Sequence, residues 1–219
     1  MKQFAILWDM DGVLVDTGEA HFLTWHQTLA EIGVTYTRED FRLTFGMNNA
    51  GVLEYVYGEP QDPDIVDKLS QQKEELFREM MRVGVELLPG VEGWIKQFKA
   101  WGWKQAIASS APRENINVLV DGLKIRSHLD AMVSGVDLPP KPAPDVFLKA
   151  AAEIGVGPEN SLVIEDSLAG VGGAANAGMK CIAVTTTNPR EALHQAGLVF
   201  DDLTELTPET LLSFLEVEQ

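Results

Sequence analysis

Short apolar runs alternate along this chain with amphipathic stretches of helical period, and this alternation constrains the fold more than any other feature. The apolar runs have the length and composition of β-strands. Strands that alternate with helices form a parallel sheet with helices on both faces, joined by right-handed crossovers. The sequence therefore predicts an α/β fold. The runs are residues 4–8, 105–109, 131–134, 162–164 and 181–184.

The interval between the first two apolar runs has no strand pattern and is too long for a single crossover. Residues 20–32 form one amphipathic stretch, and residues 64–81 form a longer one that is rich in Lys, Glu and Gln. We therefore expect an all-helical domain inserted into the α/β core. The predicted division is a core of residues 1–15 and 88–219 and a helical insert of residues 16–87.

The charge of the chain argues against polyanionic partners. Its 33 acidic and 17 basic residues give a formal net charge of -16, which repels nucleic acid and anionic membranes. No apolar run is long enough to cross a membrane. The single cysteine, Cys181, cannot form an internal disulfide, and residues 4–8 are too short for a signal-peptide core. We expect a cytoplasmic protein that is a monomer or a weak homo-oligomer.

Polar residues stand at several predicted strand ends or in the loops that follow them. Ligands of an open parallel sheet bind beyond the carboxyl ends of its strands, so these residues are candidates for one shared site. They are Asp9 and Asp11, Ser109 and Ser110, Lys141, and Glu165 and Asp166.

Asp9 and Asp11 directly follow a fully apolar run, where two charges cost free energy unless they are used. If the chain turns at Gly12, both carboxylates reach one pocket, where one acts as nucleophile and the other donates and accepts a proton. Phosphoryl transfer through an aspartyl-phosphate needs this division of roles. The alternative is a turn or a calcium loop, but calcium loops continue with further oxygen ligands, and residues 13–15 are apolar here.

Glu165 and Asp166 end another apolar run and precede a helix start at Ser167. A second acidic cluster beside the first predicts a site for Mg²⁺, which prefers oxygen ligands and keeps room for water and a phosphate. The alternative is the ordinary preference for acidic residues at helix N-termini.

Ser109, Ser110 and Lys141 are candidates for holding a phosphoryl group, which binds hydroxyl donors and cations. A phosphorylated substrate is an anion that the net charge of the chain opposes, and Lys141 beside a metal ion offsets that charge locally. Taken singly, such residues are more often ordinary exposed side chains, so the prediction depends on their shared location beyond the strands.

As a set and in this order, these residues resemble the signature of the haloacid dehalogenase superfamily of phosphotransferases over nearly the whole chain. The matching segments are residues 9–12, 109, 141–147, 165–167, 170 and 174–179.

The resemblance implies a Rossmann-like core with an all-helical cap inserted after the first motif. It also implies Mg²⁺ held by Asp9, Asp166 and the backbone carbonyl of Asp11, with Glu165 helping through water. In the family, the residue matching Asp9 attacks phosphorus. The residue matching Asp11 protonates the leaving oxygen and later activates water, and the presence of this carboxylate disfavours cleavage of a carbon–halogen bond.

The start of the insert, residues 16–33, is similar to the cap of β-phosphoglucomutases, which makes a phosphomutase the rival of a phosphatase. A mutase grips a second phosphate with cap cations, but Phe45 and Asn49 stand where the mutase-like pattern has a Lys and an Arg. We therefore favour the phosphatase, with Phe45 and Asn49 lining the specificity pocket. Thr17 and His21 are further candidates for contact with the substrate or for proton handling.

Two interpretations from other classes are weaker. Residues 170–175 fit a loose dinucleotide-binding pattern, but the acidic pair Glu165 and Asp166 occupies the preceding turn and would repel a pyrophosphate. A non-enzymatic protein that keeps the fold would have no reason to hold so many charges together.

The sequence thus predicts a Mg²⁺-dependent phosphatase that hydrolyses a small phosphorylated metabolite. It also predicts that the helical cap closes over the site during turnover. Hinges near Asp16 and at residues 87–89 should then affect turnover without touching the substrate.

Overall fold

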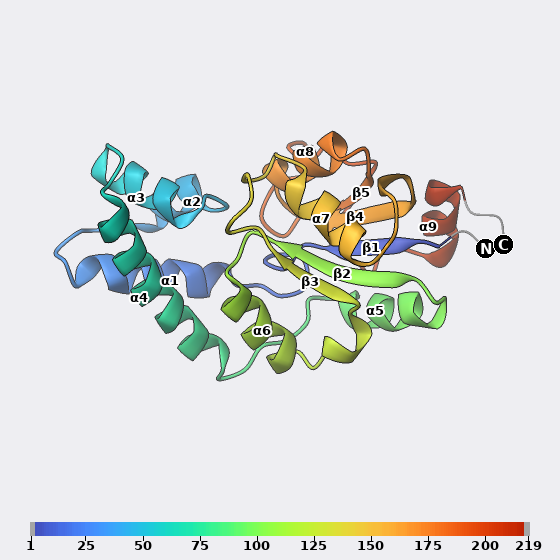
Figure 1. Cartoon of the computed structure of the whole chain (residues 1–219), viewed down its shortest axis with the longest axis horizontal. Coiled ribbons are helices and arrows are strands. Elements are labelled where there is room, and N and C mark those ends of the chain that lie inside the picture. Colours follow the sequence, from blue (N-terminus) through green and yellow to red (C-terminus); the bar gives the residue numbers. More distant parts are fainter. Residues whose placement is uncertain (1–2, 217–219) are drawn as a thin grey trace.

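The computed structural model describes residues 3–216, and within them six strands form one parallel sheet (Figure 1). The α/β prediction is confirmed. The edge strand β6, which has only three half-buried residues, was not predicted because so short a run has no clear pattern. Across the sheet the strands are β3 (Ala131–Ser134), β2 (Lys104–Ser109), β1 (Ala5–Trp8), β4 (Ser161–Glu165), β5 (Lys180–Val184) and β6 (Leu198–Phe200).

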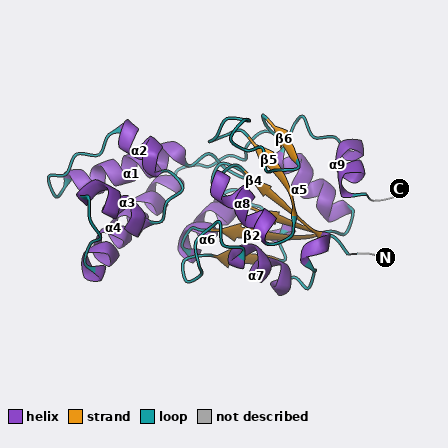
Figure 2. Cartoon of the chain, turned by 90° about the horizontal axis from the view of Figure 1, so that it is seen from above, coloured by secondary structure: helices purple, strands orange, loops and turns teal. Residues whose placement is uncertain are grey.

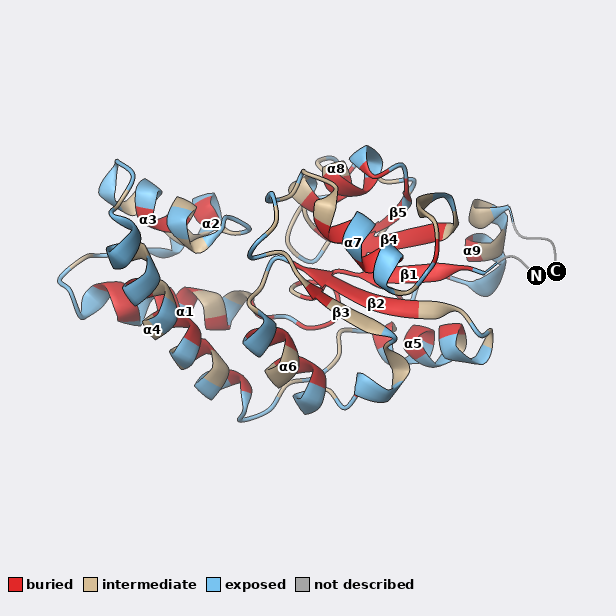
Figure 3. Cartoon of the chain, in the orientation of Figure 1, coloured by how far each residue is buried: buried red, intermediate tan, exposed pale blue. Residues whose placement is uncertain are grey.

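Both faces of the sheet are buried, which is why the strands are continuous apolar runs (Figure 3). Successive residues of a strand point to opposite faces. Ile6 and Trp8 pack on one face with helices α5 (Val91–Ala100), α6 (Arg113–Gly122) and α9 (Pro208–Leu215). Leu7 packs on the other face with α7 (Asp145–Glu153) and α8 (Leu168–Asn176). Short 3-10 turns, η1 (Arg126–His128) and η2 (Pro158–Asn160), precede β3 and β4.

Four helices between β1 and α5 gather to one side of the sheet (Figures 1 and 2). They have an apolar cluster of their own, which includes Trp25, Tyr36 and Leu53. The domain limits at residues 15/16 and 87/88 stay a prediction, and residues 1–2 and 217–219 of the predicted core lie outside the described residues. The four helices are α1 (Gly18–Ala30), α2 (Arg38–Thr44), α3 (Asn49–Tyr57) and α4 (Pro63–Met81).

The two segments that join these helices to the sheet lie side by side. The Leu88 amide donates to the Leu14 carbonyl at 3.0 Å. Around the return segment, residues 83–90, lie two surface hollows of about 590 and 410 Å³. The start of this segment is open to solvent, with Val83 90% exposed, whereas Val85, Leu87 and Leu88 pack against the core.

None of the described helices combines the length and the hydrophobicity that crossing a bilayer requires.

Candidate active site

The register of the sheet brings the predicted site residues to one edge. Trp8 pairs with Ile107 on one side and with Ile164 on the other, so Asp9 follows β1 at the level where β2 and β4 end. The Asp9 amide donates to the Ile164 carbonyl at 2.9 Å. In a parallel sheet the carboxyl ends of all strands share one edge, and side chains far apart in the sequence meet there.

Lys141 links two of the predicted acidic residues. Its ammonium donates to Asp9 Oδ1 at 2.5 Å and to Glu165 Oε1 at 2.7 Å, and its side chain is only 8% exposed. Burial opposes the charge on Lys141, but the two carboxylates outweigh burial and raise its pKa. Burial raises the pKa of Asp9 to about 7, with Lys141 acting in the opposite direction. Lys141 is therefore a permanent cation beside a carboxylate that is easily protonated.

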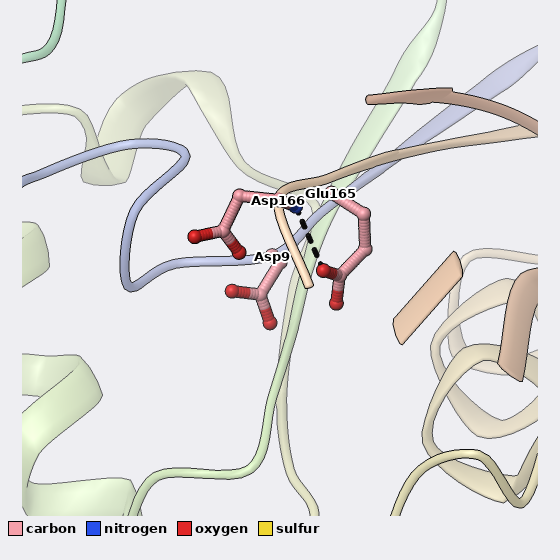
Figure 4. A group of neighbouring side chains, drawn as sticks. All are labelled: Asp9, Glu165 and Asp166. Carbon is pink, nitrogen blue, oxygen red and sulfur yellow. Dashed lines mark hydrogen bonds between the residues drawn. The ribbon is translucent and has the colours of Figure 1, made fainter. Parts of the chain in front are cut away.

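Both oxygens of Glu165 accept hydrogen bonds from the protein. Its Oε2 accepts from the backbone amide of Asp166 at 2.8 Å (Figure 4). The same oxygen accepts from the Ser167 amide at 2.8 Å and from Ser167 Oγ at 2.9 Å. Its Oε1 is taken by Lys141. Glycine at position 170 makes room for this carboxylate, because a Cβ there would lie 1.7 Å from Glu165 Oε1. Glu165 thus anchors Lys141 and the β4–α8 turn.

Asp166 is oriented by two residues that the sequence analysis missed. Thr187 Oγ1 donates to Asp166 Oδ2 at 2.5 Å, and Asn188 Nδ2 donates to Thr187 Oγ1 and to the Asp166 carbonyl, both at 3.1 Å. Burial, Glu165 and Asp9 raise the pKa of Asp166 well above its ordinary value. A signal for these residues was present, because 185–188 is a fifth polar segment that directly follows an apolar run.

Asp11 accepts a hydrogen bond from Thr17 Oγ1 at 2.6 Å, and His21 Nε2 lies 3.5 Å from the same carboxylate oxygen. Burial alone would raise the pKa of Asp11, but His21 and Thr17 outweigh burial and lower it. On the other side of the imidazole, Lys73 Nζ lies 2.9 Å from His21 Nδ1. The predicted residues Asp11, Thr17 and His21 therefore form one connected group.

Lys73 was also missed, although the sequence carried a signal for it. The buried stripe of α4 repeats every four residues through Leu69, Lys73, Phe77 and Met81, so that a lysine occupies a core position of an amphipathic helix. A cation at such a position needs a partner. The lysine, 2% exposed, has one in Glu74, whose Oε1 accepts from Lys73 Nζ at 2.9 Å.

The remaining predicted residues divide between the sheet edge and the insert. Ser109 is buried with its Oγ accepting from the Ala111 amide at 3.1 Å, while Ser110 is exposed. Phe45 lies edge-on to the His21 ring with ring centroids 6.5 Å apart. Asn49 Nδ2 donates to Glu74 Oε1 at 3.1 Å. Its side chain is thus engaged within the insert.

The donor set at the sheet edge fits a divalent cation. Asp9, Glu165 and Asp166 are buried and each has an oxygen within 4.8 Å of the others (Figure 4). Lys141 alone does not balance three buried carboxylates, and hard oxygen donors are those that Mg²⁺ prefers. Because protein donors already occupy both oxygens of Glu165, Asp9 and Asp166 are the residues that would hold the ion directly.

Comparison with known proteins shows which family the chain resembles. The sequence pattern of the family "Haloacid dehalogenase-like hydrolase" matches residues 6–184. Over 218 residues the chain is 31% identical to the phosphorylated carbohydrates phosphatase of Thermotoga maritima, covering 97% of this chain and 98% of that protein. It is 29% identical over 217 residues to the β-phosphoglucomutase of Bacillus subtilis, covering 94% of this chain and 93% of the relative.

Another relative is much longer. The chain is 34% identical over 227 residues to SUPPRESSOR OF QUENCHING 1 of Arabidopsis thaliana, which covers 97% of this chain but only 21% of that protein.

Among solved structures, CbbY from Rhodobacter sphaeroides in complex with phosphate is 28% identical, with a TM-score of 0.86 and coverage of 98% of this chain and 100% of CbbY. The resemblance found in the sequence is thus confirmed, and so is the prediction of a hydrolase. The strand-end carboxylates, the parallel sheet and the match over residues 6–184 lead to one conclusion: this chain belongs to the haloacid dehalogenase-like hydrolase family.

Proposed function

We propose that this chain is a Mg²⁺-dependent phosphatase that hydrolyses a small phosphorylated metabolite, a sugar phosphate or a similar phosphomonoester, through an aspartyl-phosphate on Asp9. The observation that carries the proposal is that Asp9 and Asp166, which follow the neighbouring strands β1 and β4, lie close together, with Lys141 of the β3–α7 loop bonded to Asp9. It is supported by similarity along the whole chain to a phosphatase of phosphorylated carbohydrates.

The first step is attack on phosphorus by one carboxylate oxygen of Asp9. The bond between phosphorus and the substrate's alcohol oxygen breaks, and that oxygen takes a proton from Asp11. Lys141 has three N–H donors, of which Asp9 and Glu165 use two, so one remains for a phosphoryl oxygen. Mg²⁺ held by Asp9, Asp166 and the Asp11 carbonyl would offset the negative charge on the transferring group.

In the second step Asp11 takes a proton from water, which attacks phosphorus and releases Asp9 and inorganic phosphate. The lowered pKa of Asp11 suits this step, because its carboxylate is ionised in the free protein. The first step needs the protonated acid. A phosphorylated substrate beside Asp11 raises its pKa, since a like charge disfavours ionisation.

A phosphomutase is the second candidate, because β-phosphoglucomutase is a relative of similar identity. A mutase has to hold a second phosphate. Two features favour a substrate with a single phosphate: Phe45 and Asn49 are uncharged, and the buried Lys73 is already paired with Glu74.

We further propose that residues 16–87 form a cap that closes over the sheet edge and excludes water during turnover. The neighbouring connecting segments support this view, because a closing motion can be concentrated at Asp16 and residues 87–89.

The experiment that tests the function is phosphate release from a panel of phosphorylated sugars, glycolate phosphate and nucleotides, with Mg²⁺ and with EDTA. It is run beside an assay for conversion of glucose 1-phosphate to glucose 6-phosphate. Mg²⁺-dependent release supports the phosphatase. Conversion without release favours the mutase instead.

The same panel tests the nucleophile. Asp9→Asn should lower turnover by a factor of about 10⁴ or more, because removing the nucleophile removes both steps. Circular dichroism should show an unchanged fold, since the amide keeps the shape and can still accept from Lys141. Substantial turnover in the folded variant would contradict the mechanism.

A further inference from the structure

A buried polar cluster joins α4 of the helical insert to α6 of the sheet layer. It consists of Lys73, Glu74 and Arg78 on α4 and Asn115 on α6. Asn115 is fully buried, and Glu74 is 6% exposed. A buried polar group is costly unless its partners are in place, so the cluster holds these two helices in a defined position.

The side-chain amide of Asn115 is hydrogen-bonded both at its nitrogen and at its oxygen. Asn115 Nδ2 donates to Glu74 Oε2 at 2.6 Å, and Arg78 donates to Asn115 Oδ1 at 3.0 Å. A carboxylate only accepts and a guanidinium only donates, so the partners fix the orientation of the amide. Glu74 and Arg78 lie four residues apart, about one helical turn, so both reach Asn115 from the same face of α4. We call this pair of residues the clamp on Asn115.

Glu74 also contacts residues that lie nearer to the active site. Its second oxygen, Oε1, accepts from Lys73 Nζ at 2.9 Å and from Asn49 Nδ2 at 3.1 Å. Its charge keeps the ammonium of Lys73 compensated in a position that is 2% exposed.

Lys73 in turn fixes the side chain of His21. An ammonium only donates, so His21 Nδ1, 2.9 Å away, accepts. The ring proton of neutral His21 then sits on Nε2, which is the nitrogen 3.5 Å from Asp11 Oδ1. The chain of contacts runs by hydrogen bonds from Asn115 to His21, and its last step is the 3.5 Å approach of His21 Nε2 to the carboxylate of Asp11.

We propose that Asn115 is a positioning residue that acts through Glu74, Lys73 and His21 to orient Asp11. Asp11 then has its working geometry only while α4 of the insert is seated on α6. The effect on turnover rests on the proposed function, whereas the effect on His21 does not.

The first test measures kcat and KM in the wild type and in substitutions of Asn115 and Asn117. Asn115→Leu leaves Glu74 Oε2 without its donor and should lower kcat by at least about 10-fold, towards the roughly 100-fold that a misplaced catalytic group costs, with KM little changed. The milder Asn115→Ser is used if the leucine variant does not fold. Asn117→Leu is the matched control, because Asn117 lies on the same helix but its side chain bonds Arg126.

A purely structural role for Asn115 is separated by repeating the substitution in a His21→Gln background. If Asn115 acts through His21, the loss in kcat largely disappears there, because coupled positions are not additive. An equal loss in both backgrounds overturns the proposal.

The second test reads His21 directly and needs no substrate. The chain has four histidines, so their ring nitrogens can be assigned by ¹⁵N NMR with His21→Gln as reference. We expect the Nε2–H tautomer of His21 in the wild type and a shifted signal in the Asn115 variants, with the other three histidines unchanged. An unchanged His21 signal overturns the proposal, even if no phosphatase activity is found in the wild type.

Discussion

At the scale of single residues, the orientation of Asp166 depends on a hydroxyl contributed by another loop. Thr187 Oγ1 occupies Asp166 Oδ2 and leaves Oδ1 for a metal ion. Gly12 lets this carboxylate pack closely, because a Cβ at position 12 would lie 1.9 Å from Asp166 Oδ2. Asp166 is therefore fixed before any ion binds, which reduces the cost of ordering it.

Thr187→Val should weaken Mg²⁺ binding by about 10-fold, since partners of metal ligands typically contribute that much or more. Isothermal titration with Mg²⁺ measures the change. Thr185→Val is the control, because Thr185 bonds Asp201 and not Asp166. Equal affinities in the two variants would contradict this role of Thr187.

The pH dependence of Mg²⁺ binding follows from the raised pKa values of the two carboxyls that would hold the ion, Asp9 and Asp166. Asp9 holds a proton below its pKa of about 7, burial raises the pKa of Asp166 as well, and the ion has to displace these protons. The apparent affinity should therefore fall as the pH decreases below 7, by up to about 10-fold per pH unit for each proton released. Titrations at pH 5.5 to 8, with Asp9→Asn for comparison, measure the slope.

The contribution of Asp9 to the stability of the metal-free protein should change in the opposite direction. Between 3.8 and about 7 the folded chain binds more protons at Asp9 than the unfolded chain does. This residue's contribution to the free energy of unfolding therefore decreases as the pH rises through that window. Thermal denaturation of the wild type and of Asp9→Asn in EDTA should isolate this decrease as a difference between the two proteins, and added Mg²⁺ should reverse it near neutral pH in the wild type.

At the scale of elements, the β4–α8 turn is built around the Glu165 carboxylate. Ser167 caps α8 by accepting from the Gly170 amide at 3.0 Å, and its own amide donates to Glu165. The start of the helix and the anchor of Lys141 are thus one unit. The small residues of α8, which resemble a dinucleotide-binding pattern in the sequence, allow α8 to pack closely against α7. A Cβ at position 173 would lie 3.1 Å from the ring of Phe147 on α7.

Gly170→Ala should lower the free energy of unfolding by about 1–3 kcal/mol, because overpacking a filled site costs that much. The cause is the contact of 1.7 Å that its Cβ would make with Glu165 Oε1. Gly93→Ala on α5 is the control, since nothing lies within 4 Å of a Cβ there. The control should be neutral or slightly stabilising, because alanine favours a helix more than glycine does. Urea denaturation measures both.

At the scale of the whole molecule, the helical insert meets the sheet layers through the clamp on Asn115 and through two connecting segments. Val83 is 90% exposed, so a protease can reach the connecting segment of residues 83–88. If the insert closes, Mg²⁺ together with a metal fluoride that mimics the phosphoryl group should slow proteolysis there. Asp9→Asn is the control, because it lacks the carboxylate that such an analogue binds. Equal cleavage rates with and without the analogue would argue against closure. The oligomeric state and the cytoplasmic location stay predictions.

Much of the fold was readable from the sequence because the signals are local. Five of the strands and the helical nature of the insert follow from hydrophobic periodicity, which depends only on neighbouring residues. Strand β6 was missed because an edge strand of three half-buried residues gives no such signal.

The sequence alone determined which residues lie at the carboxyl edge of the sheet. Asp9, Lys141 and Asp166 each come after an apolar run, and that order along the chain can be read without the structure. Only the tertiary structure decided how those residues divide their tasks. Glu165 accepts from Lys141 and from backbone amides, Thr187 orients Asp166, and Lys73 reaches His21 from another helix. The contacts made by Lys141, Thr187 and Lys73 join residues 21 to 52 positions apart, and side-chain hydrogen bonds of such range depend on packing geometry that no local pattern records.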